Sequence, residues 1–158
     1  LYFCFRFSAI SPMIRFFYPA IFRRWFDSEA DLAPHLALGR RGERLAAEYL
    51  RVHRHKILYR NFRAPHGGEI DLVCRDRRHD ELVFVEVKTR TDEAFGRPLQ
   101  AVNRKKRRLI LRGAMTWLRM LDMPDITFRF DVVEVLMHEP PEIRHIENAF
   151  QLPADYSY

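Results

Sequence analysis

Residues 82–88, with the sequence LVFVEVK, constrain the fold more than any other part of the chain. Their β-branched and aromatic side chains are typical of a buried strand. Because side chains alternate across a strand, Glu86 and Lys88 share one face and the three valines share the other. The face with Glu86 and Lys88 is either a functional site or an ordinary exposed row of charged side chains in which the lysine neutralises the glutamate.

A second strand is predicted over residues 69–74 (EIDLVC), followed by a polar turn at residues 75–81. If this turn closes a symmetric hairpin, opposed residues have numbers that sum to about 156 or 157. Asp71 then lies across from Glu86 or next to it. Opposed side chains on one face have Cβ atoms roughly 4.5 to 5.5 Å apart, so the two carboxylates repel each other unless a proton or a cation intervenes.

The carboxylate pair predicts a metal site, because hard divalent cations such as Mg²⁺ and Mn²⁺ bind carboxylate oxygens. A cation bound by Asp71 and Glu86 can polarise a phosphodiester and lower the pKa of a bound water. Lys88, on the same face, can orient that water and offset developing charge. Glu43 is a third candidate, since its spacing places it with the apolar face of the first helix. The alternative is that Glu43 complements the helix dipole.

Hydrophobic periodicity predicts the remaining elements. Helices are expected over residues 41–52 and 98–121, and strands over residues 56–62, 127–136 and 143–150. The chain order is therefore helix, three strands, helix, then one or two strands. That order predicts an α/β fold with a mixed central β-sheet flanked by helices.

Charge is spread unevenly along the chain. Residues 39–60 carry +5, residues 61–95 carry −2, residues 96–120 carry +8 without one acid, and residues 121–158 carry −6. Basic stretches around an acidic middle suit a polyanion held at a carboxylate site, although solvated helix faces would give the same pattern. The predicted nucleic-acid contacts lie on the second helix: Arg104, Lys105, Lys106, Arg108 and Arg112. Of these, Lys106 lies nearest the core edge.

The two ends of the chain are expected to be tails of one domain that covers residues 39–150. Residues 1–38 form a basic, aromatic extension that we expect to be poorly ordered, and residues 151–158 form a C-terminal tail. Arginines interrupt each apolar run before it reaches the length of a membrane span. Because Cys4 and Cys74 form no CxxC pair, the expected compartment is the cytoplasm. A membrane-surface scaffold that uses the extension is a competing class of function.

Six short motifs follow one another between residues 39 and 150. They are GxxGE from Gly39, NFR from Asn61, GEIDLV from Gly68, VEVKTR from Val85, AV from Ala101 together with Lys106, and RFDVV from Arg129. In this order they resemble the YraN family of bacterial endonuclease-like proteins. That family is similar to archaeal Holliday junction resolvases within the PD-(D/E)XK nuclease superfamily.

The resemblance implies a restriction-endonuclease-like fold and Mg²⁺- or Mn²⁺-dependent hydrolysis of phosphodiester bonds. Asp71, Glu86 and Lys88 match the superfamily's metal-binding and catalytic residues, and Glu43 matches the helix glutamate of the resolvase-like branch. Ile70 stands where the superfamily has proline. The expected substrate is branched or single-stranded DNA, with RNA binding and a homodimer left open. The alternative is a nucleic-acid-binding module whose nuclease core is weak or silent.

Overall fold

The computed structural model describes residues 33–91 and 102–152. It contains the predicted elements in the predicted order of helix, three strands, helix and two strands. These are α2 (Pro34–Val52), β1 (His55–Ala64), β2 (Gly68–Asp76), β3 (Glu81–Arg90), α3 (Arg104–Met120), β4 (Phe128–Leu136) and β5 (Glu142–Phe150). Within this part of the chain, no helix has the length and apolar character that crossing a membrane requires.

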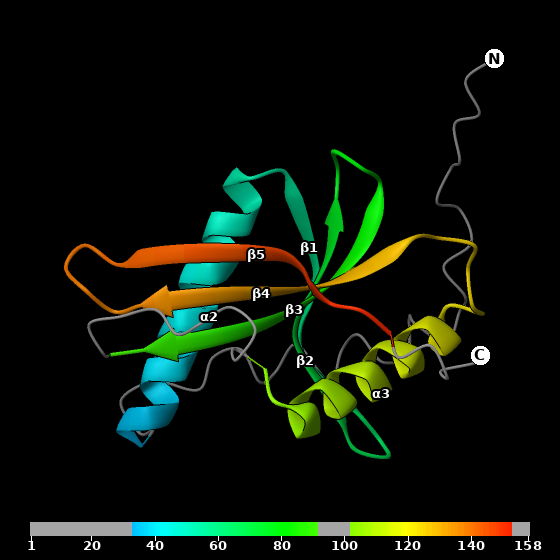
Figure 1. Ribbon diagram of the computed structural model, residues 1–158, viewed down its shortest axis with the longest axis horizontal. Coiled ribbons are helices and arrows are strands. Elements are labelled where there is room, and N and C mark those ends of the chain that lie inside the picture. The colour runs from blue at the N-terminus through cyan, green and yellow to red at the C-terminus, as the bar shows by residue number, and fades with distance from the viewer. Residues whose placement is uncertain (1–32, 92–101, 153–158) are drawn as a thin grey trace, which may run out of the picture. The chain divides into compact units, whose positions relative to one another are not determined.

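The five strands form one mixed sheet in the order β1-β2-β3-β4-β5. The pairs β1/β2, β2/β3 and β4/β5 are antiparallel. β3 and β4 are parallel, as expected for two strands that a helix connects. Figure 1 shows α2 crossing the sheet and α3 lying along the end where β1 turns into β2. This α/β architecture is consistent with a restriction-endonuclease-like fold and confirms the predicted fold class.

Each helix buries its apolar face on a different side of the sheet. On the α2 side, Ala46 and Leu50 pack against strand residues that include Val83 and Val85. On the α3 side, a cluster that contains Phe84 packs against helix residues Ile110, Leu111, Ala114, Met115 and Leu118. The alternation along β3 therefore follows the prediction, and Glu86, two residues beyond Phe84, lies on the α3 side.

Both helices begin at positions other than those predicted. α2 begins at Pro34, so the last residues assigned to the extension are helical. Proline is favoured at a first helical position because its missing N–H needs no partner there. α3 begins at Arg104 rather than at residue 98, because the Asn103 side chain caps it by accepting a hydrogen bond from Lys106 N at 2.9 Å. Residues 98–101 lie outside the described residues.

The turn between β1 and β2 lies directly against the backbone of α3. A Cβ atom on Gly68 would meet the backbone nitrogen of Gly113 at 2.4 Å. A Cβ atom on Gly113 would meet Glu69 N at 3.2 Å. On Gly113 the added Cβ atom would meet the Ile70 side chain first, at 3.0 Å, whereas on Gly68 it would meet only backbone, which cannot move aside as a side chain can. Glycine at position 68 is therefore what allows the turn to reach the helix.

We expect Gly68→Ala to destabilise the protein by about 1–3 kcal/mol, because the added methyl group overpacks this contact. The matched control is Gly39→Ala in α2, where an added Cβ atom would have nothing within 4 Å. That change should stabilise the helix by up to about 1 kcal/mol. Urea unfolding of both variants measures the difference, and equal stability of Gly68→Ala and the wild type would contradict the close contact.

Candidate functional site

Asp71 and Glu86 come together where the pairing of the β2–β3 hairpin ends. The last pair of the register is Leu72 with Val85, so that opposed residue numbers sum to 157, as hairpin symmetry predicted. Asp71 and Glu86 directly follow this pair, and there the Asp71 side chain accepts a hydrogen bond from Val87 N. The charges of Glu86 and Lys106 both act on Asp71, so the three side chains are neighbours.

The Asp71 carboxyl group is held in a position that disfavours its charge. Burial is the largest influence that raises the pKa of Asp71, and the charge of Glu86 raises it further. A hydrogen bond of 2.7 Å from Val87 N to Asp71 Oδ2 and the charge of Lys106 act in the opposite direction without cancelling the rise. The pKa of Asp71 therefore lies well above its ordinary value, and a proton or a cation at this carboxyl group is favoured.

Glu86 is the most buried acid of the site, with 2% of the residue exposed. Its Oε1 accepts a hydrogen bond of 2.7 Å from Lys88 Nζ. Its Oε2 lies 3.2 Å from Lys106 Nζ but makes no hydrogen bond within the described part of the chain. Each oxygen of Glu86 therefore has one ammonium group beside it, Lys88 at Oε1 and Lys106 at Oε2.

Lys106 points into the site rather than along the exposed side of α3. Its Nζ lies 2.5 Å from Glu69 Oε1 as well as near Glu86. Burial alone would lower the pKa of Lys106, but the hydrogen bond to Glu69 and the charges of Glu86 and Asp71 raise it overall. The hydrogen bond from Lys106 is also the main reason that the pKa of Glu69 is lowered. Lys106, predicted as a nucleic-acid contact, thus has two carboxylate partners inside the protein.

Glu43 approaches this group from α2. Its side chain is partly buried, and its Oε2 accepts a hydrogen bond of 2.9 Å from Asn61 Nδ2 on β1. Asn61 has a φ of 53°, a left-handed conformation that asparagine tolerates better than most residues. The charge of Glu43 contributes to the raised pKa of Asp71. Glu43 therefore acts on the site electrostatically, while its hydrogen bond goes to β1.

We call Glu69, Asp71, Glu86, Lys88 and Lys106 the carboxylate–lysine cluster. Glu69 shares a face with Asp71 in the sequence pattern, but alternation alone gave it no role. Among residues 33–91 and 102–152, no three histidine, cysteine or acidic side chains are grouped so that they could hold a metal ion. In this cluster Lys88 and Lys106 form ion pairs with Glu69 and Glu86, and Asp71 forms none within the described residues.

Comparison with known proteins gives the family. The model of the uncharacterised protein family UPF0102 matches residues 42–135. The chain belongs to this family. It is 50% identical over 117 residues to a UPF0102 protein of Geobacter metallireducens, covering 73% of this chain and 93% of that relative. It is 44% identical over 121 residues to a UPF0102 protein of Rhodococcus opacus, covering 75% of this chain and 100% of that relative.

The UPF0102 match confirms the family that the six motifs predicted under the name YraN. The matched residues include Glu43, all five members of the carboxylate–lysine cluster and the whole of α3. Membership of UPF0102 does not by itself assign an activity, so a relationship to nucleases has to be argued from the geometry of the cluster.

The other cations predicted to contact nucleic acid lie on the exposed side of α3 in this UPF0102 protein. The exposed residues are Arg104, Lys105, Arg108 and Arg112. Lys105, Arg108 and Arg112 recur at helical spacing, so they form one stripe along the helix. Lys106 is separated from this stripe because it turns toward the sheet.

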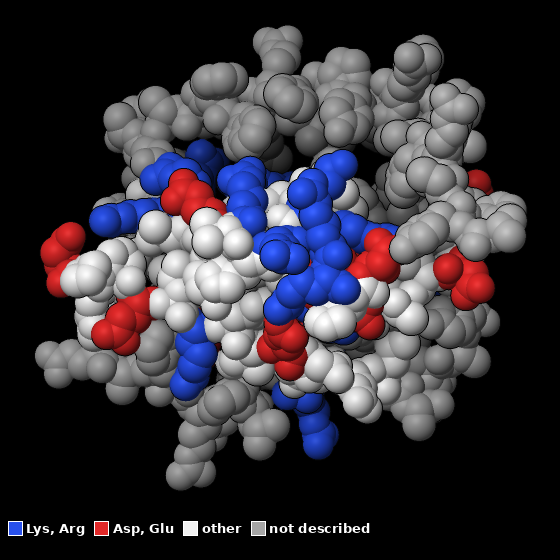
Figure 2. All heavy atoms as spheres, turned by 90° about the horizontal axis from the view of Figure 1, so that it is seen from above, with Lys and Arg blue, Asp and Glu red and all other residues white. Residues whose placement is uncertain are grey.

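A second polar cluster, which no sequence pattern indicated, lies at the end of the sheet that carries the β2–β3 turn. Figure 2 views this end and shows lysine and arginine side chains gathered beside several carboxylates. Arg129 lies at its centre. Its Nη2 lies 3.1 Å from Asp76 Oδ2, its Nε 3.1 Å from Asp131 Oδ1 and its Nη1 2.6 Å from Glu81 Oε2. Asp131 also contacts His145 Nε2 at 2.9 Å. One guanidinium group serves three acids here, so its loss would leave buried carboxylates without a common partner.

Proposed function

We propose that this UPF0102 protein is a metal-dependent, structure-selective DNA endonuclease that hydrolyses phosphodiester bonds. The observation that carries the proposal is that Asp71 and Glu86 come together at the end of the β2–β3 pairing, where burial and the charge of Glu86 raise the pKa of Asp71. Two acids held this close are stabilised by a hard divalent cation. Branched or single-stranded DNA is the proposed substrate, and the cytoplasm is the proposed location.

The side chains of the cluster fit Mg²⁺ or Mn²⁺ by the chemistry of their donor atoms. Asp71 and Glu86 offer only carboxylate oxygens, the ligands that these ions prefer, whereas zinc sites use histidine and cysteine. Lys106 Nζ lies 3.2 Å from Glu86 Oε2, so an ion at this oxygen would share it with that ammonium group. Asp71 and Glu86 would hold the ion, with Glu43 as a more distant acid. When bound, the ion supplies polarisation of the phosphodiester and a water of lowered pKa.

The two lysines would perform different tasks around that ion. Lys88 is 32% exposed at its side chain, so its ammonium group can meet a substrate while it holds Glu86 Oε1. From there it can orient the attacking water and offset charge on the phosphate oxygens. Lys106 is less exposed and holds Glu69 and Glu86, so we assign it a positioning role.

The direct test is incubation of the full chain with branched, nicked, single-stranded and duplex DNA, in Mg²⁺, in Mn²⁺ and in EDTA. The proposal expects cleavage of the branched or single-stranded substrates in at least one metal and none in EDTA. The proposed endonuclease activity would be refuted if no substrate is cut in either metal and calorimetry detects no Mn²⁺ binding.

A nucleic-acid-binding module with a silent nuclease core is the second candidate, and a specific observation favours it. Lys88 and Lys106 both lie against Glu86, so the acid already has two compensating charges without an ion. A protein of this kind would bind nucleic acid in EDTA as well as in Mg²⁺ and would cut nothing. Calorimetry separates the two candidates, because only the enzyme needs a Mn²⁺ site that disappears when Asp71 is changed.

Changing Lys105, Arg108 and Arg112 together to alanine is expected to weaken nucleic-acid binding evenly across sequences. Contacts to phosphate strengthen binding without reading bases, and each one lost lowers the slope of log affinity against log salt by about 0.7 to 0.9. Three lost contacts should therefore flatten the slope by about 2 to 3. Fluorescence anisotropy at several salt concentrations measures it. An unchanged slope would mean that the stripe faces away from the nucleic acid.

A further inference from the structure

We propose that the β1–β2 turn and the second half of α3 form a binding site for backbone phosphates of a nucleic-acid strand, distinct from the carboxylate–lysine cluster. The inference rests on the proposed nucleic-acid function. A cavity of about 160 Å³ lies between the turn and the helix. It is lined by Ala64, His66, Gly67, Arg112, Met115, Thr116 and Arg119.

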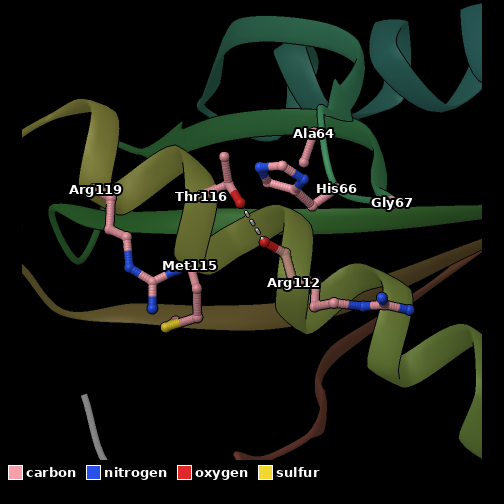
Figure 3. Close-up of a pocket in the computed structure, with 7 residues that line it drawn as sticks. All are labelled: Ala64, His66, Gly67, Arg112, Met115, Thr116 and Arg119. Atoms are coloured by element: carbon pink, nitrogen blue, oxygen red, sulfur yellow. Dashed lines mark hydrogen bonds between the residues drawn. The ribbon is translucent and has the colours of Figure 1, made fainter.

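The polar side chains around this cavity are two arginines, a histidine and a threonine. Arg112 and Arg119 are exposed and come from α3, while His66 comes from the turn and lies across from the helix (Figure 3). The Thr116 hydroxyl donates to the carbonyl oxygen of Arg112 at 2.9 Å, so its proton is already used within the helix. None of the residues that line the cavity is an acid. Guanidinium groups without nearby carboxylates suit a phosphate group.

The absence of an acid from this lining contrasts with the end of the sheet seen in Figure 2, where cations and carboxylates lie together. There Arg78 lies 2.8 Å from Glu147 and 3.1 Å from Asp76. Arginines paired in this way have less charge to offer an anion. The cavity beside α3 is therefore the better phosphate site of the two basic regions.

The turn is shaped so that a ligand can approach its backbone. Gly67 has a φ of 75°, which glycine adopts without strain. A Cβ atom on Gly67 would lie 4.0 Å from Arg112 Nη1, so the guanidinium group lies close above the turn. The contact between Gly68 and Gly113 holds this turn against α3. The site is thus formed before any ligand arrives, which lowers the cost of binding.

The spacing of the arginines matches the spacing of phosphates. Arg112 and Arg119 are seven residues apart, a rise of about 10.5 Å along the helix axis. One strand of duplex carries a phosphate about every 3.4 Å of axis, so the two arginines match phosphates about three nucleotides apart.

The test measures binding of the full chain to a fluorescein-labelled single-stranded oligonucleotide in EDTA, so that cleavage plays no part. The double variant Arg112→Ala/Arg119→Ala is expected to bind about tenfold more weakly at low salt, with the salt slope lowered by about 1.4, or about 0.7 for each contact. The control is Arg77→Ala, which removes an exposed arginine just after the last residue of β2, whereas the turn that lines the cavity precedes the first residue of β2. It should leave affinity and slope unchanged.

A second measurement follows the imidazole resonance of His66 by NMR, assigned through its loss in His66→Asn. The oligonucleotide should shift this resonance in the wild type and in Asp71→Asn, but not in the double variant. Equal binding by the double variant and the wild type would overturn the site, even if metal-dependent cleavage is found. A shift with inorganic phosphate and none with the oligonucleotide would also overturn it, because the site would then take free phosphate. If the wild type binds the oligonucleotide without cutting any substrate and the double variant loses that binding, the result would support the phosphate site and refute only the endonuclease activity.

Discussion

Asp71→Asn and Glu86→Gln are each expected to lower metal-dependent cleavage by more than about 100-fold. Both substitutions nearly preserve the shape of the side chain but remove the negative charge that would hold the cation. Changing the outer partners of metal ligands typically costs 10- to 100-fold, so the loss of a ligand itself should cost more. Single-turnover cleavage in Mg²⁺ and in Mn²⁺ measures the rate, and calorimetry with Mn²⁺ measures the site.

The control for this prediction is Glu48→Gln, which removes an exposed acid from α2 outside the carboxylate–lysine cluster and should leave the rate unchanged. Nucleic-acid binding by the Asp71 and Glu86 variants should be retained or strengthened, because a charge that repels phosphate is gone. Lys88→Ala should lose rate while it keeps the affinity for Mn²⁺, since its task begins once water and phosphate are in place. Full activity of Asp71→Asn would remove this carboxylate from the mechanism.

Arg129→Met is expected to lower the free energy of unfolding by about 3–5 kcal/mol, which is the usual cost of removing one partner from a buried ionic cluster. The Arg129 side chain is 10% exposed, and Asp76 and Asp131 are fully buried. Without the guanidinium group, these two acids remain buried but lose the partner that they share. Urea unfolding measures the loss.

The matched control is Arg63→Met, because the side chain of Arg63 is 73% exposed. Arg63 forms an ion pair in which its Nη1 lies 3.4 Å from Glu69 Oε2. That change should cost less than about 1 kcal/mol, as exposed ion pairs do. The free energy of unfolding of Arg129→Lys should lie between those of Arg129→Met and Arg63→Met. One ammonium group cannot bind three carboxylates in the geometry of a guanidinium group. Stability of Arg129→Met close to that of the Arg63 control would show that the cluster contributes little.

The same cluster links stability to pH. Burial alone would raise the pKa of Asp131, but hydrogen bonds from His145, Asn148 N and Arg129 lower it overall. A lowered folded-state pKa contributes stability above the unfolded value, near pH 4, and this stability is lost as the pH falls. Arg129→Met removes one cause of the lowering, so the decline of stability below about pH 4 should be shallower in the variant than in the wild type.

Periodicity and local symmetry were sufficient to predict the elements and the carboxylate pair. The alternation of LVFVEVK placed Glu86 and Lys88 on one face, and the symmetric register of the turn brought Asp71 near Glu86, although the pairing ends one residue earlier. Both inferences depend only on residues close in sequence, because a strand has a period of two and an antiparallel hairpin has one simple register. The starts of the helices were less well predicted, since the cap at Asn103 depends on one hydrogen bond rather than on a repeating pattern.

Only the tertiary structure decided which partners the charged side chains have. Lys106 belongs to an unbroken run of basic residues, and it turns toward Glu69 and Glu86 because α3 packs with that edge against the sheet. Arg129 meets Asp76 because β2 and β4 bring together residues 53 positions apart. A long charged side chain can reach many partners, and the distances that choose among them come from the packing of helices and strands. Sequence therefore determined the faces of the elements, whereas tertiary packing determined which charges meet.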